Sequence, residues 1–344
     1  MNPYILSMMI SNLALGVIIT ATSYHWFFAW VGLELNTLAI IPIMAKQHHP
    51  RATEATTKYF IIQATASSII LLSSILNAWH TGNWDITKLT TYPTPTMLTI
   101  ALAMKLGLAP MHFWLPEVMQ GTNMLAAMLV ATWQKLPPMT LLWMTANQLP
   151  TLVLFMLSIL SALIGGWSGL NQTQLRKIMA FSSIGHLGWM IAISSSSQKL
   201  LLLTLTIYML MTISIFSILI TLTAKTTKDL GMMWTTSPTL STIMMIILMT
   251  LGGLPPLIGF VPKWLILQEL TTNHLTPLAI TLALASLLSL MFYMRMVYIT
   301  TLTTSPNTMT NPMKWRFKPN KPISPTPIII ATFLLIPMTP IMYL

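Results

Sequence analysis

Long apolar stretches, separated by short polar ones, follow one another along almost the whole chain. Each stretch has about 20 residues, the length that an α-helix needs to cross the hydrocarbon core of a bilayer. The pattern predicts eleven spans, near residues 3–22, 26–45, 56–79, 95–119, 123–145, 150–170, 174–195, 199–223, 237–269, 275–300 and 324–343. We therefore expect an all-α polytopic membrane protein that forms a single membrane domain over residues 1–344.

Glycine and proline interrupt two of these spans. The fourth carries Gly107 and Pro110 beside Lys105, and the ninth carries Gly-Gly-Leu-Pro-Pro over residues 252–256, ahead of Lys263. Irregular backbone survives at membrane depth only where it is buried in protein or lines a wet cavity. A pair of interrupted helices is typical of transporters built from inverted repeats. We expect two five-helix units of opposite orientation, over about 1–146 and 150–300, then a loop and a C-terminal helix over about 301–344.

Basic residues gather in alternate loops of this predicted topology. Only Lys88 and Lys199 fall on the side opposite the N-terminus, and three lysines lie within spans. Counting residues at the adjoining helix ends with the loops, the other twelve fall on the N-terminal side: Lys46, Arg51, Lys58, Arg176, Lys177, Lys225, Lys228, Arg295, Lys314, Arg316, Lys318 and Lys321. By the positive-inside rule the N-terminus lies on the positive side of the membrane. An odd number of spans then puts the C-terminus on the opposite side.

Composition limits the kinds of functional site that the chain can contain. The chain is 54% hydrophobic and 7% charged, whereas soluble domains are about 25% charged. Cysteine is absent, which excludes iron–sulfur ligation, thiolate zinc sites and disulfides. No glycine-rich phosphate loop occurs. The net charge of +11 comes from the loops, so it indicates membrane topology rather than nucleic-acid binding. We expect no cofactor and no metal in this chain.

Four charged residues remain inside the predicted spans: Glu34, Lys105, Lys135 and Lys263. A charge near the bilayer centre costs roughly 2.5–3.5 kcal/mol on insertion scales, so such residues usually serve ion or proton paths. The competing interpretation is that these buried charges are structural and only fix helix packing. Because an opposite charge within ~4–6 Å shifts a pKa by roughly 1–3 units, Glu34 is the natural partner of Lys105.

The histidines are weaker candidates for residues of a proton path. His186 lies in the middle of the seventh span and suits either a proton relay near neutral pH or a structural role. His112 lies near a helix end, where a structural role is favoured. Glu54 and Lys58 are four residues apart and are expected to pair on one helix face.

Several motifs carry a resemblance to a known family. They are the run Gly-Leu-Asn-Gln-Thr-Gln-Leu-Arg-Lys-Ile-Met-Ala-Phe-Ser-Ser-Ile over residues 169–184, Trp-Val-Gly-Leu-Glu ending at Glu34, Met-Lys-Leu-Gly-Leu-Ala-Pro over 104–110 with His-Phe-Trp-Leu-Pro-Glu over 112–117, and Gly-Gly-Leu-Pro-Pro over 252–256. Across essentially the whole chain the sequence resembles the subunit 2 family of the mitochondrial NADH:ubiquinone oxidoreductase, respiratory complex I. Related antiporter-like subunits share the broken-helix lysines, but the Asn-Gln-Thr-Gln stretch indicates subunit 2.

The resemblance implies a mitochondrially encoded protein of the inner membrane, with the N-terminus in the matrix and the C-terminus in the intermembrane space. A mitochondrial code that reads an extra codon as Met would account for the 29 methionines. The family's proposed proton-path residues match Glu34, Lys105, Lys135 and Lys263. The resemblance implies enzymatic activity only as part of the complex, with NADH, FMN, iron–sulfur clusters and ubiquinone in partner subunits.

The implied partners are other membrane-arm subunits, including antiporter-like neighbours and small supernumerary subunits, and lipids such as cardiolipin, but no nucleic acid. Two rival functions stay open at this point. The broken helices also suit a stand-alone cation/proton antiporter. The buried charges also suit a structural membrane subunit without its own proton path.

Overall fold

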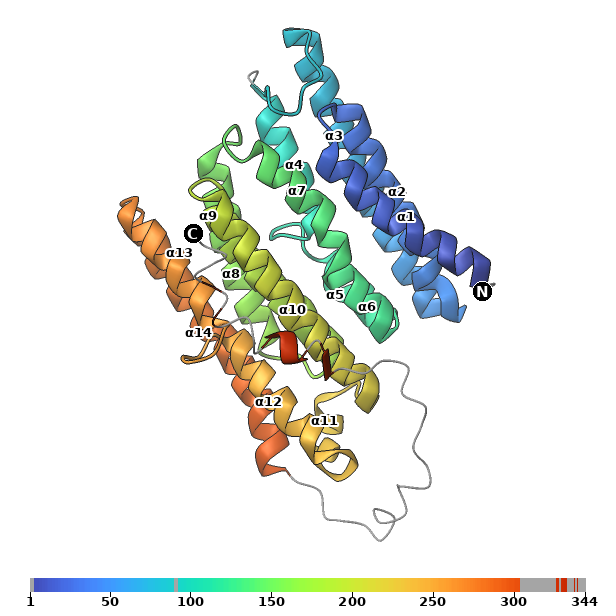
Figure 1. The fold of residues 1–344 in the computed structure, drawn as a ribbon, viewed down its shortest axis with the longest axis vertical. Helices are drawn as coiled ribbons and strands as arrows, with labels where there is room; N and C mark the ends of the chain where they lie inside the picture. Colours follow the sequence, from blue (N-terminus) through green and yellow to red (C-terminus); the bar gives the residue numbers. More distant parts are fainter. Residues whose placement is uncertain are drawn as a thin grey trace.

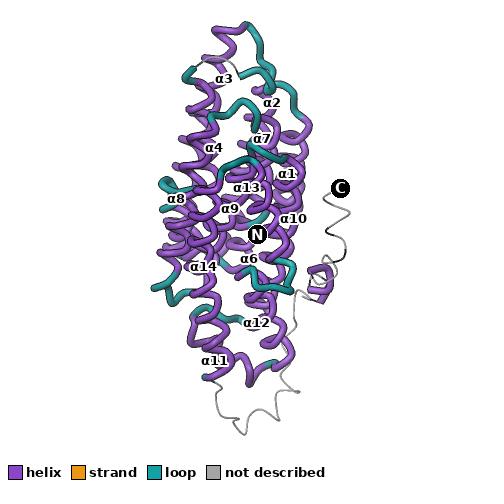
Figure 2. Tube along the Cα trace, turned by 90° about the vertical axis from the view of Figure 1, so that its left-hand side faces the viewer, coloured by secondary structure: helices purple, strands orange, loops and turns teal. Residues whose placement is uncertain are grey.

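Helices that run side by side make up the described part of the chain (Figure 1). The computed structural model describes residues 3–89, 92–303, 326–327, 329–332, 337 and 339. The helices remain aligned along the long axis in a view at right angles (Figure 2). Within the described ranges, β-structure is limited to two isolated bridges.

The first half of the chain contains α1 (Pro3–Thr22), α2 (Trp26–Met44), the 3-10 turn η1 (Ala45–Gln47), α3 (Pro50–Thr81), α4 (Thr94–Leu106), α5 (Trp114–Gly121), α6 (Met124–Ala131), the 3-10 turn η2 (Trp133–Lys135) and α7 (Leu136–Thr145). The second half contains α8 (Thr151–Gly169), α9 (Leu175–Ser194), α10 (Gln198–Leu222), α11 (Thr227–Thr236), α12 (Pro238–Gly252), α13 (Phe260–Thr272) and α14 (Thr276–Leu302).

The predicted class, an all-α membrane protein, is confirmed. Six helices are long and apolar enough to cross a bilayer, namely α1, α2 with η1, α3, α8, α10 and α14. The 20-residue α9 forms the predicted seventh span. The predicted total of eleven spans is not confirmed, because most of the span near 324–343 lies outside the described residues. The short helix α11 was not predicted.

Three of the predicted spans are broken, rather than two. The breaks between α4 and α5 and between α12 and α13 lie where glycine and proline predicted them. The fifth span, predicted as one stretch over 123–145, is divided into α6, η2 and α7. Pro137 and Pro138 stand in the first turn of α7, where a missing backbone N–H leaves no intrahelical bond unmade.

The ends of α4 and α12 share one geometry. Gly107 and Gly253 adopt left-handed φ angles of 76° and 79°. The N–H of Leu108 donates to the Ala103 carbonyl at 2.9 Å, and the N–H of Leu254 donates to the Met249 carbonyl at 3.4 Å. This is the Schellman pattern, which satisfies the last carbonyls of a helix and requires a residue that tolerates positive φ.

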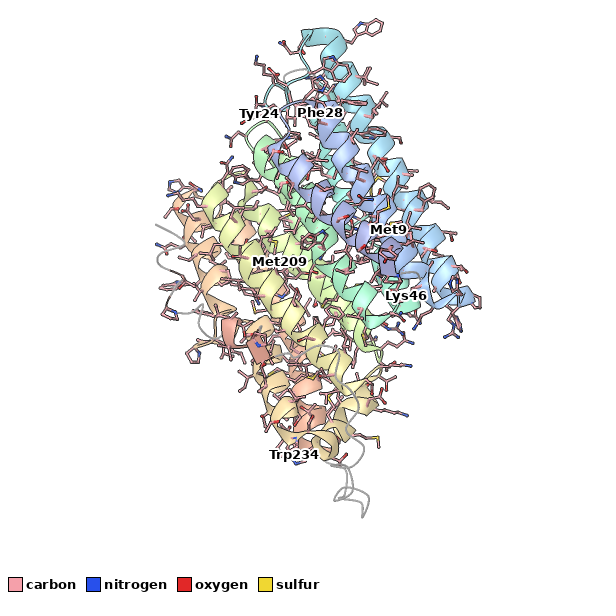
Figure 3. All side chains as sticks on the ribbon, turned by 45° about the vertical axis from the view of Figure 1, so that its right-hand side comes forward. Met9, Tyr24, Phe28, Lys46, Met209 and Trp234 are labelled. Atoms are coloured by element: carbon pink, nitrogen blue, oxygen red, sulfur yellow. The ribbon has the colours of Figure 1, made fainter. Side chains whose placement is uncertain are left out.

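A matching loop contact occurs at each end of the bundle. The loop before α2 pairs with the loop after α3 through the bridge of His25 with Asp85, and the loop before α9 pairs with the loop after α10 through Gln174 and Thr226. Figure 3 shows Tyr24 near one end of the molecule and Trp234 near the other. Such a recurrence at opposite ends is what two units of opposite orientation would give. The unit boundaries near 146 and 150 stay a prediction.

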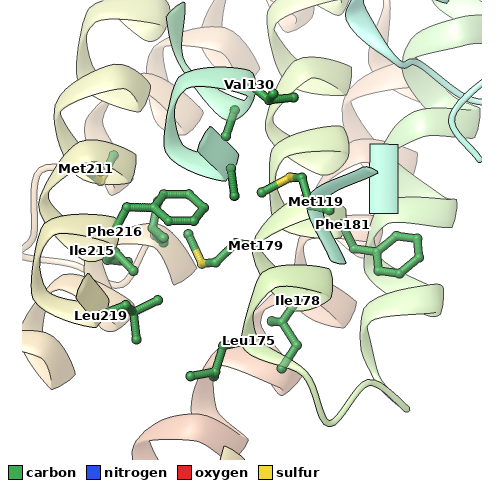
Figure 4. Packing of buried hydrophobic residues seen from close by; sticks show 14 of the residues in the cluster. Met119, Val130, Leu175, Ile178, Met179, Phe181, Met211, Ile215, Phe216 and Leu219 are labelled. Carbon is green, nitrogen blue, oxygen red and sulfur yellow. The ribbon is translucent and has the colours of Figure 1, made fainter. Parts of the chain in front are cut away.

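The apolar core joins the two halves of the chain. In Figure 4, Met119 of α5 and Val130 of α6 lie in one packed cluster with Met179 of α9 and Phe216 of α10. Large apolar side chains also face outward: Leu152 is 68% exposed and Met291 is 62% exposed. An apolar exterior is expected where lipid is the solvent. Ionisable side chains that are buried inside such a bundle are the candidates for a functional site.

Candidate functional site

Lys105 lies in the last turn of α4, directly before the first helix break. Its side chain is buried, and its Nζ has no hydrogen-bond partner among the described residues. Its backbone carbonyl accepts a hydrogen bond from Gln63 Nε2 of α3 at 3.4 Å. The carbonyl end of a helix carries partial negative charge, so this position favours a cation.

Glu34 lies half-buried within α2, where Thr37 Oγ1 donates to its Oε2 at 3.1 Å. In the described parts of the chain, however, no contact ion pair joins Glu34 to a lysine. The expected Glu34–Lys105 pair therefore does not form a closed salt bridge.

One small polar cavity connects Lys105 to Lys135. Tyr59, Gln63 and Gln134 also line it, and about 10 Å³ of it is accessible to the centre of a water molecule. A single water needs roughly that much space and 2–4 polar partners. Two of the four buried charges thus line one cavity that has room for about one water molecule.

Lys135 ends the turn η2 and is 3% exposed. Its Nζ donates to the hydroxyl of Tyr208 at 2.9 Å and lies 4.9 Å from the centre of that ring. Tyr208 belongs to α10, in the second half of the chain. The lysine of the first half is therefore held by a tyrosine of the second.

His186 and Lys263 share two further cavities, of about 10 and 20 Å³ by the same measure. Lys263 lies in the first turn of α13 and donates from Nζ to the carbonyl of Gly252 at 2.9 Å, across the second break. His186 Nε2 is 3.5 Å from the hydroxyl of Tyr293. Tyr208 lines the larger cavity, and its ring centre is 5.7 Å from that of His186.

The structure thus divides four of the five predicted residues into two groups. Lys105 and Lys135 line the first cavity, His186 and Lys263 line the second pair, and Glu34 lines none of the three. Tyr208 links them, and sequence reasoning missed it. The only sequence signal was one tyrosine within the apolar run 200–222, which is also typical of ordinary core packing. Alternating side chains and water-sized gaps of this kind suit proton transfer.

Other charged or titratable groups lie outside these cavities, in ion pairs or packing contacts. The predicted Glu54–Lys58 pair is confirmed at 2.8 Å, and Lys58 also binds Glu117 at 2.7 Å on the surface. His112 is buried in the loop between α4 and α5 and packs against the tilted ring of Phe113, with ring centres 4.4 Å apart. Over the described residues, no group of three or more His, Asp or Glu side chains is placed to hold a metal ion.

Two family models together match most of the chain. The family described as NADH:quinone oxidoreductase/Mrp antiporter, TM, matches residues 23–289. The family described as NADH dehydrogenase subunit 2 C-terminus matches residues 290–343. The first match includes Glu34, Lys105, Lys135, His186, Tyr208 and Lys263, and Tyr293 falls in the second.

Individual relatives agree with the family models. The chain is 52% identical to NADH-ubiquinone oxidoreductase chain 2 of Latimeria chalumnae over 343 residues, which is 99% of both chains. It is 53% identical to the protein of the same name from Varanus timorensis, again over 99% of both. Among solved structures, respiratory complex I from Thermus thermophilus with bound aureothin contains a chain that matches with a TM-score of 0.87 at 23% identity, over 100% of this chain and 80% of that one.

Proposed function

The chain belongs to the family of NADH-ubiquinone oxidoreductase chain 2, and on this premise we propose that it moves protons through the membrane arm of respiratory complex I. The proposed path runs from Glu34 through Lys105 and Lys135 to His186 and Lys263. NADH oxidation and ubiquinone reduction would take place in partner subunits, which would also hold FMN and the iron–sulfur clusters.

One observation carries this proposal: from Lys105 to Lys263, the buried titratable residues occur in a series, each within one cavity or one hydrogen bond of the next. Lys105 and Lys135 share the first cavity, Lys135 binds Tyr208, and Tyr208 shares the larger second cavity with His186 and Lys263. Buried charges that served only to fix packing would be expected in closed ion pairs, since an unpaired buried charge is strongly destabilising. Lys105 has no such pair among the residues described.

The gap between Glu34 and Lys105 suggests how a proton is loaded and released. An opposite charge brought within ~4–6 Å changes a pKa by roughly 1–3 units, which switches the occupancy of a titrating group. If Glu34 approaches Lys105 in one state of the complex and withdraws in another, the affinity of Lys105 for its proton changes between them. The shared cavity then offers Lys135 as the next acceptor.

The proposal includes location and orientation. We place the chain in the mitochondrial inner membrane with its N-terminus in the matrix. The support is the concentration of basic residues at the helix ends on that side, including Lys46, Arg176 and Lys225. Its partners would be other membrane-arm subunits and lipids such as cardiolipin, which would cover the outward-facing apolar side chains.

A lysine replacement tests the path. In complex reconstituted into vesicles, Lys105→Met removes the charge but keeps an unbranched apolar side chain. We expect fewer protons moved per NADH oxidised. Lys88→Met is the matched control, because Lys88 is exposed and binds only Asp85, at 3.1 Å, among the described ion pairs.

The two rival functions give different results in the same vesicles. Wild-type proton movement per NADH in Lys105→Met would favour a structural role for the charges. Exchange of Na⁺ or K⁺ for protons by the purified chain, without any redox partner, would favour a stand-alone antiporter.

A further inference from the structure

The backbone break beside Lys135 is closed by a side chain from the other half of the protein. In a continuous helix the carbonyl of Ala131 would accept the N–H of Lys135. In η2 that N–H instead donates to the Thr132 carbonyl at 3.1 Å. The freed carbonyl of Ala131 accepts the hydroxyl proton of Tyr208 at 2.9 Å.

The same hydroxyl oxygen accepts a hydrogen bond from Lys135 Nζ at 2.9 Å. A lysine ammonium can only donate, so the hydroxyl oxygen must accept and its proton must point to the Ala131 carbonyl. After Lys135 loses its proton, the neutral amine has a lone pair. The hydroxyl can then turn and donate to the amine, which releases the carbonyl. The direction of this bond therefore depends on whether Lys135 is charged.

We propose that Tyr208 is a positioning residue that holds Lys135 at the junction of the two cavity groups, an inference that rests on the proposed path. The hydrogen bond between the Tyr208 hydroxyl and Lys135 reverses its direction when Lys135 changes charge. Tyr208 is 2% exposed and contributes to the cavity that contains His186 and Lys263. Charge on Lys135 is thereby coupled to the bonding of a residue that faces the second half of the path.

Other titratable groups surround this pair on each packed helix. Lys105 of α4 and Tyr59 of α3 line the cavity of Lys135. His186 of α9 lies against the Tyr208 ring, Lys263 of α13 lines the same cavity as Tyr208, and Tyr293 of α14 lies 3.5 Å from His186. A pH readout must therefore compare variants that leave all five of these groups in place.

Tyr208→Phe is the direct test, because it removes the hydroxyl and keeps the ring that packs against His186. In the intact complex in vesicles, we expect assembly and NADH oxidation, fewer protons moved per NADH, and a pH profile of pumping displaced by about one unit, the size expected from losing one hydrogen bond to a charged group. Tyr298→Phe is the matched control, since Tyr298 is 65% exposed on α14. A Tyr208→Phe complex with the pumping and pH profile of Tyr298→Phe would overturn the proposal.

A double variant keeps the test decisive if Tyr208→Phe fails to assemble. Removing both partners of a buried hydrogen bond costs less than removing one, because Lys135 is then no longer left as an unpaired charge. The Ala131 carbonyl loses its donor equally in the single and the double variant. Recovery of assembly in Lys135→Met/Tyr208→Phe would support a tyrosine that acts through the lysine. Continued failure would show that Tyr208 only packs α6 against α10, and would overturn the proposal.

The outcomes also separate this inference from the proposed function. Loss of pumping in Lys135→Met, together with normal pumping and pH profile in Tyr208→Phe, overturns the role of Tyr208 alone. Normal pumping in Lys135→Met overturns both.

Discussion

Replacing Gly253 by alanine should displace Lys263 from the second helix break. A Cβ added at Gly253 would stand 2.8 Å from Lys263 Nζ and 2.9 Å from its Cδ. These contacts are shorter than carbon and nitrogen atoms tolerate. Because a lysine side chain moves more easily than helix backbone, we expect Lys263 to lose its hydrogen bond to the Gly252 carbonyl.

Two effects contribute to the size of this change. The left-handed φ of 79° at Gly253 costs an L-residue roughly 1–2 kcal/mol. A hydrogen bond from a charged group contributes about 1.5–3 kcal/mol, so its loss lowers the occupancy of the bonded position of Lys263 roughly tenfold to a hundredfold. Only the second effect acts on the proposed path.

A second glycine separates the two effects. Gly82, which ends α3, has a φ of 71°, and a Cβ there would meet nothing within 4 Å. Gly82→Ala therefore imposes similar backbone strain without touching a path residue. Measured as protons moved per NADH in vesicles, Gly253→Ala should pump less than Gly82→Ala at equal content of assembled complex. Equal pumping by the two variants would refute this account of Lys263.

Two further predictions concern groups outside the path. Burial works to raise the pKa of Asp229, but hydrogen bonds from the backbone N–H groups of Thr226 and Lys225 outweigh it and hold the pKa below its usual value. The stabilisation of α11 by the Asp229 cap is therefore complete above about pH 3.9 and is lost as the pH falls through the lower pKa of the folded state. At pH 7, Asp229→Ala should speed amide hydrogen exchange in α11 by an amount equivalent to about 1 kcal/mol or less, since solvent screens the group. Unchanged exchange would contradict this. Glu117→Gln breaks an exposed ion pair with Lys58. Because solvent screens such pairs, the midpoint of thermal unfolding should change little and pumping should be unchanged. Reduced pumping would instead place this pair in the path.

Much of the fold follows from local signals in the chain. Gly107 and Gly253 mark two helix breaks because their positions require positive φ. The third break carries a weaker signal. Residues 131–136 (Ala-Thr-Trp-Gln-Lys-Leu) contain no glycine or proline, and the following Pro137 and Pro138 suit the first turn of a helix as well as a kink. Only the packed structure shows that η2 separates two helices there.

Less of the site than of the fold can be predicted from the sequence. Charge in an apolar run identifies Lys105 and Lys135, because burying charge is costly in any fold. No such rule identifies Tyr208, whose role depends on a carbonyl freed in α6 and a hydroxyl supplied by α10, 77 residues away. The distance between Glu34 and Lys105 likewise depends on how α2 packs in the bundle, which no local pattern specifies.

Proton movement per NADH oxidised in the complex carrying Lys135→Met tests the central claim most directly. Lys135 is the residue through which the first cavity reaches Tyr208 and the second half of the protein. The proposed path predicts an assembled complex that oxidises NADH but moves fewer protons per NADH than the Lys88→Met control. A wild-type ratio in Lys135→Met would contradict it.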